Sequence, residues 1–328
     1  MQVLEGLTTI PAGARGLVLA IGNFDGVHRG HQAILARTRA TAKSLGAPAG
    51  VMTFEPHARE YFRPDRPMFR LTPLPRKLEL FAACGLDAAI VLPFEKALVE
   101  LSARAFVTDW LVAKLAVRHV VVGFHFFFGK GREGTPDTLR KLGEELGFGV
   151  TVVAPEGTLD EVFSSTRIRE LLAEGHVRDA ADMLGHWWRV TGRVIGGNKI
   201  GTGMGFPTAN IQLPRGVQLH HGIYGVRVRH KIGQEGGGQY RGAAYLGTRP
   251  TFDNGLPVLE VFLFDFDQEI YGDTIDIDFI AFLRQDAKFR SVEALMAQME
   301  KDCEAARVAV TAADREDPMA AYPLGRTA

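Results

Sequence analysis

The chain has 328 residues, 46% of them hydrophobic and 23% charged, and its 38 Lys and Arg residues balance 38 Asp and Glu residues. This length exceeds what one hydrophobic core usually organises, so we expect two domains, and the balanced charge excludes a general attraction to nucleic acid or to anionic membranes. Cys84 and Cys303 are too few for a disulfide framework or a four-ligand zinc site, and no apolar run is long enough for a membrane span. We therefore expect a cytoplasmic protein with small-molecule partners, neither exported nor membrane-inserted, that is a monomer or weak homo-oligomer.

The first part of the chain, residues 1–186, alternates short apolar runs with segments whose apolar residues recur at helical spacing. This alternation is typical of an α/β domain in which helices cover both faces of a parallel, doubly wound sheet. The predicted strands are residues 16–22, 49–54, 88–94, 119–124 and 149–154, and the predicted helices are residues 31–46, 75–85, 102–116, 136–147 and two short helices within 164–185. Such sheets bind ligands at the carboxyl ends of their strands.

The second part, residues 187–328, consists of strand-like segments separated by glycine-rich turns. The predicted strands are residues 187–197, 222–231, 240–247, 259–266 and 274–283, and one helix is predicted near the end, at residues 291–313. Closing these strands into a barrel removes the edges that a short open sheet would expose, so we expect a small antiparallel β-barrel with a terminal α-helix. The glycine-rich residues 233–239 are interpreted as a mobile hairpin loop.

A glycine-rich turn, "AIGNFDGVHRGH" at residues 20–31, joins the first of these strands to the first helix. Free N–H groups and the positive end of the helix dipole make such a turn suitable for phosphate. His28 and His31 can donate hydrogen bonds to phosphate oxygens there and, when protonated, supply positive charge. The turn has neither the G-x-G-x-x-G pattern nor a Walker lysine, so a phosphate site here has another design. The alternative is a glycine turn with two histidines that face solvent.

Two further residues of this turn carry polar side chains, Asn23 and Asp25. Both are interpreted as ligand-contacting or turn-fixing residues. For Asp25 the simple role of a turn former stays open, because aspartate is common in turns for local reasons.

A second candidate site is "SSTRIR", near the end of the first part. Ser164, Ser165 and Thr166 begin a predicted helix, and Arg167 and Arg169 follow in its first turn. N-capping explains one serine, but the helix dipole disfavours cations at this end unless an anion is bound there. We therefore predict that Ser165, Thr166 and Arg169 bind a triphosphate.

Glu260 is the candidate general base of the second part. It lies within "VLEVFLFDF", with apolar residues on both sides. A carboxylate in such surroundings is unfavourable unless it is paired or its pKa is raised, and a raised pKa suits a general base. The alternative is a glutamate at the end of the barrel that faces water.

These motifs resemble those of a known family. "FDGVHRGH" and "SSTRIRELLAEGHV" resemble the H-x-G-H and S-T-x-x-R signatures of the nucleotidyltransferase superfamily, and in particular the FAD synthetase module of the bacterial bifunctional riboflavin kinase/FAD synthetases. "TFEPHARE", "RLTP" and "VVGFHFFFGKGREG" agree with that module, and "GFPTANI", "GIYGV", "GTRPTF", "LEVFLFDF", "YGD" and "FLRQDAKF" resemble the riboflavin kinase module. The resemblance implies a Rossmann-like nucleotidyltransferase domain at residues 1–186 and a riboflavin kinase barrel at residues 187–328.

For the first domain, the resemblance implies transfer of AMP from ATP to FMN, which gives FAD and pyrophosphate. His28, His31 and Arg169 would stabilise the ATP phosphates as pyrophosphate leaves, and the FMN phosphate would attack the α-phosphorus without an enzyme nucleophile. The implied ATP and phosphate contacts of this domain are Gly22, Asn23, Gly30, Ser164, Ser165 and Thr166.

The resemblance also implies where flavin is contacted, although ordinary core packing is the competing account for each phenylalanine. The candidates are Phe54, His57 and Phe62 in "TFEPHAREYF" and His125, Phe126 and Phe128 in "FHFFFG". In the family the metal is approached at the second of these segments, where Asp or Asn is common at the position of His125.

For the second domain, the resemblance implies phosphorylation of riboflavin by ATP with Mg²⁺. Glu260 would activate the terminal ribityl hydroxyl for attack on the γ-phosphate. Thr208 and Asn210 would bind Mg²⁺ and phosphate, since oxygen ligands suit this hard cation. Gly201 and Gly205 would let backbone amides approach the phosphates.

The leading hypothesis is a bifunctional enzyme that makes FMN from riboflavin and then FAD from FMN, with Mg²⁺ in both steps. Two departures from the family pattern keep an alternative open: Thr202 stands where an arginine is common, and Tyr245 stands where "ANIG" has asparagine. That alternative is a monofunctional FAD synthetase whose barrel binds flavin and has weak or no kinase activity. A flavin storage or sensor protein without turnover is disfavoured by the histidine pair and Glu260.

Overall fold

The computed structural model describes residues 1–6, 11, 14–157, 162–196, 208–231, 237–248 and 257–326. Its internal contacts divide the chain into two compact units, which change over between Ser165 and Thr166. Apart from Ser165, the helices α7 (Ser165–Ala173) and α8 (Val177–Leu184) therefore belong to the second unit. The domain boundary expected after residue 186 would include both helices in the first domain, and it stays a prediction.

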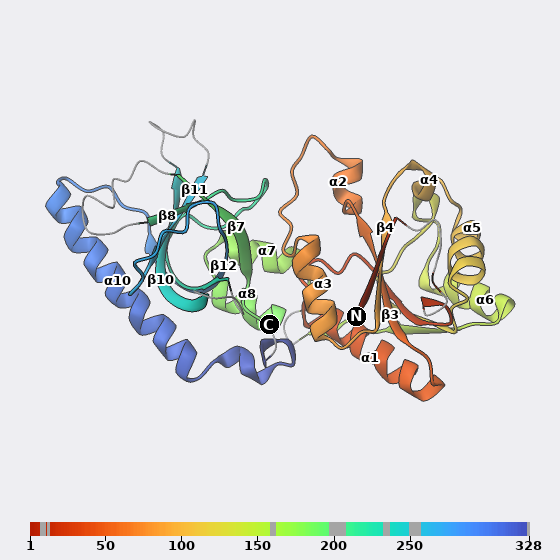
Figure 1. Ribbon diagram of the computed structural model, residues 1–328. Helices are drawn as coiled ribbons and strands as arrows, with labels where there is room; N and C mark the ends of the chain where they lie inside the picture. Colours follow the sequence, from red (N-terminus) through yellow and green to blue (C-terminus); the bar gives the residue numbers. More distant parts are fainter. Residues whose placement is uncertain are drawn as a thin grey trace. The chain divides into compact units, whose positions relative to one another are not determined.

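The first unit contains a six-stranded sheet with the order β1-β4-β3-β2-β5-β6, in which every neighbouring pair is parallel (Figure 1). Its strands are β1 (Gln2–Glu5), β2 (Val18–Ile21), β3 (Ala49–Glu55), β4 (Ala88–Pro93), β5 (His119–Gly123) and β6 (Gly149–Val153). Its helices are α1 (Arg29–Leu45), α2 (Ala58–Phe62), α3 (Leu74–Ala83), α4 (Lys96–Val99), α5 (Ala103–Ala105), the π-helix η2 (Phe106–Lys114), the 3₁₀-helix η3 (Lys130–Arg132) and α6 (Pro136–Leu146). The predicted α/β fold is confirmed.

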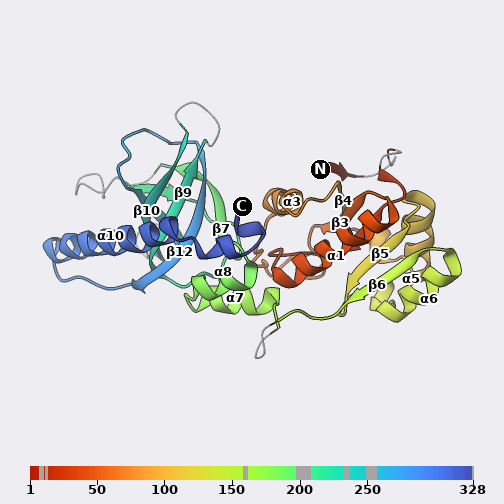
Figure 2. The same ribbon diagram turned by 90° about the horizontal axis from the view of Figure 1, so that it is seen from below.

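Helices cover both faces of this sheet, with α1 and α3 on one face and α5, η2 and α6 on the other (Figure 1). The side chains of β2 are buried on both faces, which explains why the sequence of a central parallel strand reads as a continuous apolar run. Leu19 and Ile21 belong to the core cluster on the side of η2 and α6, and successive residues of a strand point to opposite faces. Figure 2 shows α1 against the strands of the other face, where it contacts β2, β3 and β5.

The strand order places β2 at the point where the chain changes direction across the sheet. From β2 the chain proceeds to β3 and β4 on one side, and it later returns to the other side of β2 with β5. Crevices for ligands form at such a switch point, outside the carboxyl ends of the strands. The turn that follows β2 is therefore in the position where this fold binds ligands.

The second unit contains a closed barrel of six described strands with the order β10-β11-β8-β7-β12-β9. The strands are β7 (Arg189–Ile195), β8 (Thr208–Ile211), β9 (Gly222–His230), β10 (Gly238–Thr248), β11 (Pro257–Leu263) and β12 (Thr274–Gln285), and the helices that follow are α10 (Val292–Arg315), η4 (Pro318–Ala321) and η5 (Leu324–Arg326). Tyr224 and Phe279 fill the interior and are fully buried. The terminal helix α10 packs outside against β9, where a Cβ at Gly225 would lie 3.3 Å from Val310. The predicted antiparallel barrel and terminal helix are confirmed.

Several local predictions differ from the structure. The helix predicted at residues 102–116 is a short α5 that continues as a π-helix. Several short elements in the described parts of the chain are absent from the sequence prediction, because each is only three to five residues long: β1, α2, α4, η3, β8, η4 and η5. Part of the predicted loop at 233–239 lies outside the described residues. None of the helices in the described parts of the chain is long and apolar enough to span a bilayer.

Candidate active sites

The turn after β2 has an unusual backbone. Phe24 and Val27 have positive φ angles of 49° and 43°, and Gly26 between them has a φ of 90°. Left-handed backbone costs roughly 1–2 kcal/mol for an L-residue, and it is rarest for β-branched residues such as valine. Such strain persists only where surrounding contacts over-determine the conformation, and it is frequent at ligand sites. This segment, Gly22–His28, is called the histidine turn below.

Asp25 is the main anchor of the histidine turn. Its buried carboxylate accepts hydrogen bonds from the backbone N–H of Leu71 at 3.1 Å and of Thr72 at 3.1 Å. The Thr72 hydroxyl in turn accepts a hydrogen bond of 2.8 Å from the N–H of Gly26. Of the two roles that the sequence left open for Asp25, these contacts favour the turn-fixing one.

His28 caps the helix that follows. Its Nδ1 accepts a hydrogen bond from the His31 backbone N–H at 3.4 Å, and the two imidazole rings stack with centroids 3.7 Å apart. An accepting Nδ1 carries no proton, so the ring proton is on Nε2, and protonation of Nδ1 would break the cap. The cap therefore favours the neutral form of His28.

His31 is held neutral by its surroundings. Burial, together with the neighbouring His28 and Lys77, holds the pKa of His31 well below its ordinary value. The rings of His31 and Phe24 also meet edge to face at 5.2 Å. At neutral pH the histidine pair can therefore offer N–H donors to phosphate, whereas the sequence interpretation also allowed for positive charge.

Two buried polar atoms at this site lack a protein partner. Among the residues that the structure describes, no hydrogen-bond partner lies within reach of His31 Nδ1 or Asn23 Oδ1. Buried unpaired polar atoms are rare in folded proteins and often mark a place that a ligand or water completes. Gly30 follows in the first turn of α1, where a Cβ would lie 3.3 Å from the His28 ring. The predicted contacts Gly22, Asn23, Gly30, His28 and His31 thus occupy one turn and one helix N-terminus.

The second signature reaches the same turn. The Ser165 hydroxyl donates a hydrogen bond of 2.8 Å to the Asp25 carbonyl oxygen, across 140 positions of sequence. Just before it, the Phe163 ring lies under the Arg29 guanidinium at 4.3 Å. Ser164 lies between these two contacts in the chain. The structure therefore brings the start of the second motif against the histidine turn, as the two signatures together predict.

The arginines of the second signature have different surroundings. Arg167 lies 3.5 Å from Glu170 and 3.8 Å from Glu174, so ion pairs along α7 account for this cation. Thr166 is exposed and Arg169 is half-buried. The phosphate role of Thr166 and Arg169 stays a prediction.

Aromatic residues gather at the carboxyl ends of β3 and β4. The Phe94 ring lies 5.9 Å from Phe54, 5.9 Å from Phe62 and 5.5 Å from Tyr61. Phe62 is 62% exposed, which is unusual for a phenylalanine. We call these four residues the aromatic cluster. Phe94 and Tyr61 were not predicted as site residues, although Phe94 is the last residue of a predicted parallel strand.

The remaining flavin candidates, His57, Phe126, Phe128 and His125, differ in their burial and contacts. His57 caps α2, since its Nδ1 accepts a hydrogen bond of 3.1 Å from the Arg59 backbone N–H. Phe128 is 8% exposed and stacks on Phe126, so the competing account of core packing fits Phe128. His125 is exposed beside Phe124 at the carboxyl end of β5. A flavin role for these residues stays a prediction.

In the barrel, strand register gathers the predicted kinase residues. Glu260 on β11 lies opposite Asn210 on β8, and Phe262 lies opposite Thr208. Directly paired residues of antiparallel strands have Cβ atoms about 5 Å apart on the same face. Thr208, Asn210 and Glu260 are all half-buried, whereas their strand neighbours Leu259 and Val261 are fully buried. The three oxygen-bearing side chains therefore share one face of two adjacent strands.

The surroundings of Glu260 differ from those that the sequence predicted. The sequence suggested apolar surroundings on both sides, but burial alternates along β11, and Glu260 points away from the core with Val258 and Phe262. The penalty for a charged carboxylate is therefore smaller than for a fully buried one. Tyr245 lies opposite Glu260 on the other side, and its hydroxyl donates a hydrogen bond of 3.1 Å to Asp286.

Some predicted residues cannot be placed. Gly201 and Gly205, like Thr202, lie outside the described residues. Arg284 of β12 is paired with Asp302 by two contacts of 2.8 and 2.6 Å, as in an ordinary ion pair.

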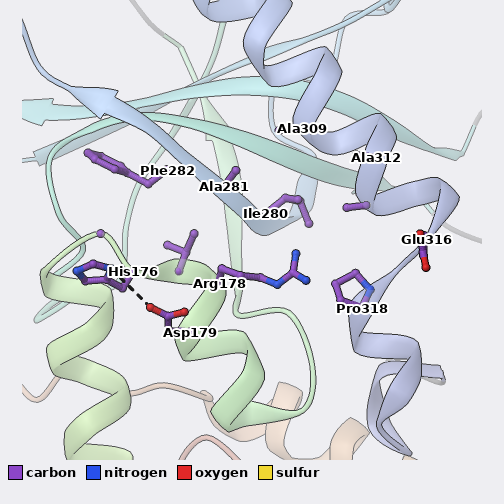
Figure 3. Close-up of a pocket in the computed structure, with 13 residues that line it drawn as sticks. His176, Arg178, Asp179, Ile280, Ala281, Phe282, Ala309, Ala312, Glu316 and Pro318 are labelled. Atoms are coloured by element: carbon purple, nitrogen blue, oxygen red, sulfur yellow. Dashed lines mark ion pairs between the residues drawn. The ribbon is translucent and has the colours of Figure 1, made fainter.

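A separate groove of about 580 Å³ lies elsewhere in the second unit, between α8, β12 and α10. Figure 3 shows His176, Arg178 and Asp179 on the α8 side, opposite Ile280 and Phe282 of β12. Alanines of α10 form another wall, and His176 lies 3.6 Å from Asp179. Thr208, Asn210 and Glu260 do not line this groove, so it is distinct from the candidate kinase site.

Comparisons with known proteins match both units. The FAD synthetase family model matches residues 10–167, and the riboflavin kinase family model matches residues 184–310. A bifunctional riboflavin kinase/FMN adenylyltransferase from Haemophilus influenzae is 39% identical over 307 residues, which cover 94% of this chain and 98% of that protein. The protein of the same name from Pseudomonas fluorescens is 41% identical over 309 residues, with 94% and 97% covered.

A solved structure has a similar fold. The crystal structure of a macrolide-efflux protein from Streptococcus pneumoniae superposes with a TM-score of 0.80 at 27% identity, and the match covers 94% of this chain and 99% of that one. The similarity spans both units, so the combination of sheet and barrel is shared. The name of that protein describes a different activity, and it does not agree with the two family models.

Proposed function

The chain belongs to the family of bifunctional riboflavin kinase/FMN adenylyltransferases, and we propose that its two reactions take place at the two candidate sites, the histidine turn and the paired face of β8 and β11. The enzyme phosphorylates riboflavin with ATP to give FMN, and it transfers AMP from a second ATP to FMN to give FAD and pyrophosphate. The match to the riboflavin kinase family over residues 184–310 favours this activity over a monofunctional FAD synthetase.

We assign adenylyl transfer to the histidine turn. An oxygen of the FMN phosphate attacks the α-phosphorus of ATP, and the bond from this phosphorus to the bridging oxygen of pyrophosphate breaks. Catalysis then depends on positioning and on stabilising the charge of the leaving pyrophosphate. The N–H groups at the start of α1 and the imidazole N–H groups of His28 and His31 can supply those hydrogen bonds. The observation that carries this assignment is the strained turn with buried, unpaired His31 Nδ1 and Asn23 Oδ1.

The flavin of FMN is assigned to the aromatic cluster. Phe54, Tyr61, Phe62 and Phe94 stand at the carboxyl ends of β3 and β4, next to β2 and its turn. The exposed Phe62 offers an apolar ring for contact with a flat aromatic ligand. Among the flavin contacts that the family resemblance implies, Phe54 and Phe62 are therefore better supported than Phe128, whose ring is buried in the core.

Riboflavin phosphorylation is assigned to the shared face of β8 and β11. Glu260 accepts the proton of the terminal ribityl hydroxyl as the hydroxyl oxygen attacks the γ-phosphorus of ATP. The bond from this phosphorus to the bridging oxygen breaks, and ADP leaves. The hydroxyl of Thr208 and the amide of Asn210 fit as ligands of a divalent cation, because both offer oxygen donors from the same face of β8, and Asn210 lies opposite Glu260 of β11. We propose Mg²⁺ as that cation. When bound, it would neutralise charge on the ATP phosphates.

The experiment that tests the function separates flavins by chromatography after purified protein reacts with ATP and Mg²⁺. With riboflavin as substrate, we expect FMN and then FAD. With FMN as substrate, we expect FAD. Failure on riboflavin together with success on FMN would support the monofunctional alternative, and no product from either substrate would contradict both activities.

We further propose a cytoplasmic location and a monomeric or weakly associating chain without nucleic-acid partners. The free thiols Cys84 and Cys303 support a reducing compartment, and burial raises their pKa values to about 12 and about 11, which makes both thiols unreactive. Cell fractionation tests the location, and light scattering during gel filtration tests the oligomeric state.

A further inference from the structure

Lys77 is a buried cation beneath the histidine turn. It lies on α3, its side chain is only 2% exposed, and its Nζ donates a hydrogen bond of 2.9 Å to the Asn23 carbonyl oxygen. The Thr53 hydroxyl on β3 donates to the same oxygen at 3.2 Å. The Asn23 carbonyl is thus held from α3 and from β3, directly before the strained Phe24.

The buried charge of Lys77 does not by itself stabilise the folded protein. Taking an ammonium group out of water costs several kcal/mol, and replacing a buried charge with an apolar side chain of similar size is often neutral or stabilising. The buried residues of α3 are the cations Arg76 and Lys77 and the apolar Leu80 and Phe81. Arg76 pairs with the exposed Glu79 of the same helix at 2.9 Å. A methionine at position 77 would fill the same space, so the positive charge itself calls for an explanation.

The charged groups around Lys77 come from several elements. Burial lowers the pKa of Lys77, Arg70 lowers it further, and the carboxylates of Asp25, Glu55 and Glu60 act in the opposite direction. Arg70 already pairs with both glutamates, through contacts that include 2.8 Å to Glu55 and 2.9 Å to Glu60.

On its other side, Lys77 acts on the histidine pair. Burial and the neighbouring His28 lower the pKa of the His31 imidazole, and the positive charge of Lys77 lowers it further. Lys77 therefore faces the Asp25 carboxylate of the turn and the imidazole of His31 at the start of α1.

We propose that Lys77 is a positioning residue for adenylyl transfer, which fixes the Asn23 carbonyl and adds a buried positive charge behind the phosphate site. It acts through Asn23 and His31 and does not touch ATP, because its side chain is sealed from the surface. This proposal rests on the assignment of adenylyl transfer to the histidine turn. It gives α3 a part in the reaction that no motif in the sequence indicates.

Two physical effects result from this position. The hydrogen bond to Asn23 holds the peptide that leads into Phe24, so its loss lets the strained turn relax and misplaces the donors of α1. A charge in a dry environment is poorly screened, so it attracts the ATP phosphates and keeps His31 neutral at lower pH. Loss of the charge raises the pKa of His31 toward its ordinary value, although burial still opposes protonation.

The test compares Lys77→Met, Lys77→Arg and the matched control Lys43→Met, which removes an exposed lysine of α1. FAD formation from FMN is measured from mildly acidic to mildly alkaline pH, and kcat and KM for ATP are separated. FMN formation from riboflavin by the same samples serves as the internal folding control. The candidate kinase site lies in the other unit, so FMN formation shows independently whether the protein is intact.

For Lys77→Met we expect kcat of FAD formation to fall about 10- to 100-fold, the usual effect of a misplaced reacting geometry. We also expect the acidic limb of the pH profile of FAD formation to move to higher pH. The reaction needs a neutral His31, and loss of the Lys77 charge raises the pKa of His31. FMN formation should stay unchanged. Lys77→Arg keeps a positive donor and should restore most of the activity and the pH profile, and Lys43→Met should behave like wild type.

Unchanged FAD formation and an unchanged pH profile in Lys77→Met would overturn the proposal. So would a loss of both activities that Lys77→Arg does not rescue, since that pattern shows a purely structural residue. His31→Ala separates this failure from failure of the site assignment. If His31→Ala loses FAD formation and Lys77→Met does not, only the role of Lys77 is wrong, and if neither loses it, the assignment of the histidine turn is wrong.

Discussion

The imidazole of His28 serves the fold and the site at the same time. By accepting the His31 N–H it caps α1, and the same bond fixes which ring nitrogen carries the proton. Stacking at 3.7 Å then ties the orientation of His31 to that of His28. Two histidines three positions apart thus form one rigid donor pair at a helix N-terminus, and substitution of either changes the other.

We expect His31→Ala to reduce FAD formation from FMN at least about 100-fold, the effect typical of losing one donor that stabilises transition-state charge. FMN formation from riboflavin should be unaffected. Flavin chromatography with each substrate measures both steps. His176→Ala, which removes an exposed histidine directly before α8, is the control and should leave both rates unchanged. A loss of less than a few-fold in FAD formation would contradict the role given to His31.

The neutral state of His31 predicts a pH dependence of stability. In the unfolded chain this histidine titrates near its ordinary pKa of about 6.5, and in the folded chain its pKa is lowered. As pH falls below about 6.5, the unfolded state binds a proton that the folded state does not, so the free energy of unfolding falls by at most about 1.4 kcal/mol per pH unit. This loss continues until pH reaches the lowered pKa.

Hydrogen exchange of β2 and α1 peptides in increasing urea measures this effect. His31→Gln keeps a polar side chain that does not titrate there, so its stability should fall less steeply than that of wild type over the same pH range. Parallel pH dependences of the two proteins would show that His31 is not held neutral in the folded chain.

Residue types and their order along the chain were enough to select the histidine pair, Asn23, Ser165 and Glu260 as candidates, and the functional roles of these residues stay predictions. Lys77, Thr72 and Phe94 could not be predicted in the same way, because their roles depend on contacts with distant segments. Lys77 bonds to Asn23 across 54 positions, and Thr72 bonds to Gly26 across 46. The direction of the Glu260 side chain also required the structure, since both of its neighbours are apolar.

Among elements, the connection between β2 and α1 depends on the loop that precedes α3. Asp25 accepts its hydrogen bonds from Leu71 and Thr72, and Lys77 follows one turn into the helix. The segment 71–77 therefore acts as a template on which the histidine turn is held in its strained form. Without this template, Phe24 and Val27 would be free to leave the left-handed region.

We expect Asp25→Ala to lower the free energy of unfolding of the first unit by about 1–3 kcal/mol, because buried N–H groups lose their acceptor. FAD formation should also fall, since the turn relaxes, while FMN formation from riboflavin stays normal. Urea denaturation and the flavin assay measure these effects. Asp137→Ala removes an exposed carboxylate on α6 and should change stability by less than about 1 kcal/mol. Equal stability of the two variants would contradict the anchoring role of Asp25.

The long, strongly apolar elements were predictable, because a parallel strand buried on both faces reads as one apolar run and a helix shows its own period. The short strands β1 and β8 were not predictable, since four residues are too few to show a periodic pattern. In the sequence, the residues of β8 were interpreted as part of a ligand-binding loop. The barrel order, in which β8 pairs with β11, could not be read from the sequence. That pairing is what brings Asn210 beside Glu260.

At the scale of the whole molecule, the two compact units carry different groups of candidate residues. The histidine turn and the aromatic cluster are built within the first unit, and the paired face of β8 and β11 is built within the second. The product of the kinase reaction is the substrate of the adenylyltransferase reaction. We therefore expect two separable sites on one chain to act in sequence.

The most direct test follows riboflavin, FMN and FAD over time with His31→Ala, with Glu260→Gln and with an equal mixture of the two, all supplied with riboflavin, ATP and Mg²⁺. Loss of a general base should slow the kinase step about 100- to 10,000-fold. We expect His31→Ala to stop at FMN, Glu260→Gln to leave riboflavin unchanged but to convert added FMN to FAD, and the mixture to make FAD from riboflavin after a lag. If either variant loses both reactions, or if each still makes FAD from riboflavin at the wild-type rate, the two sites are not separate and the account is wrong.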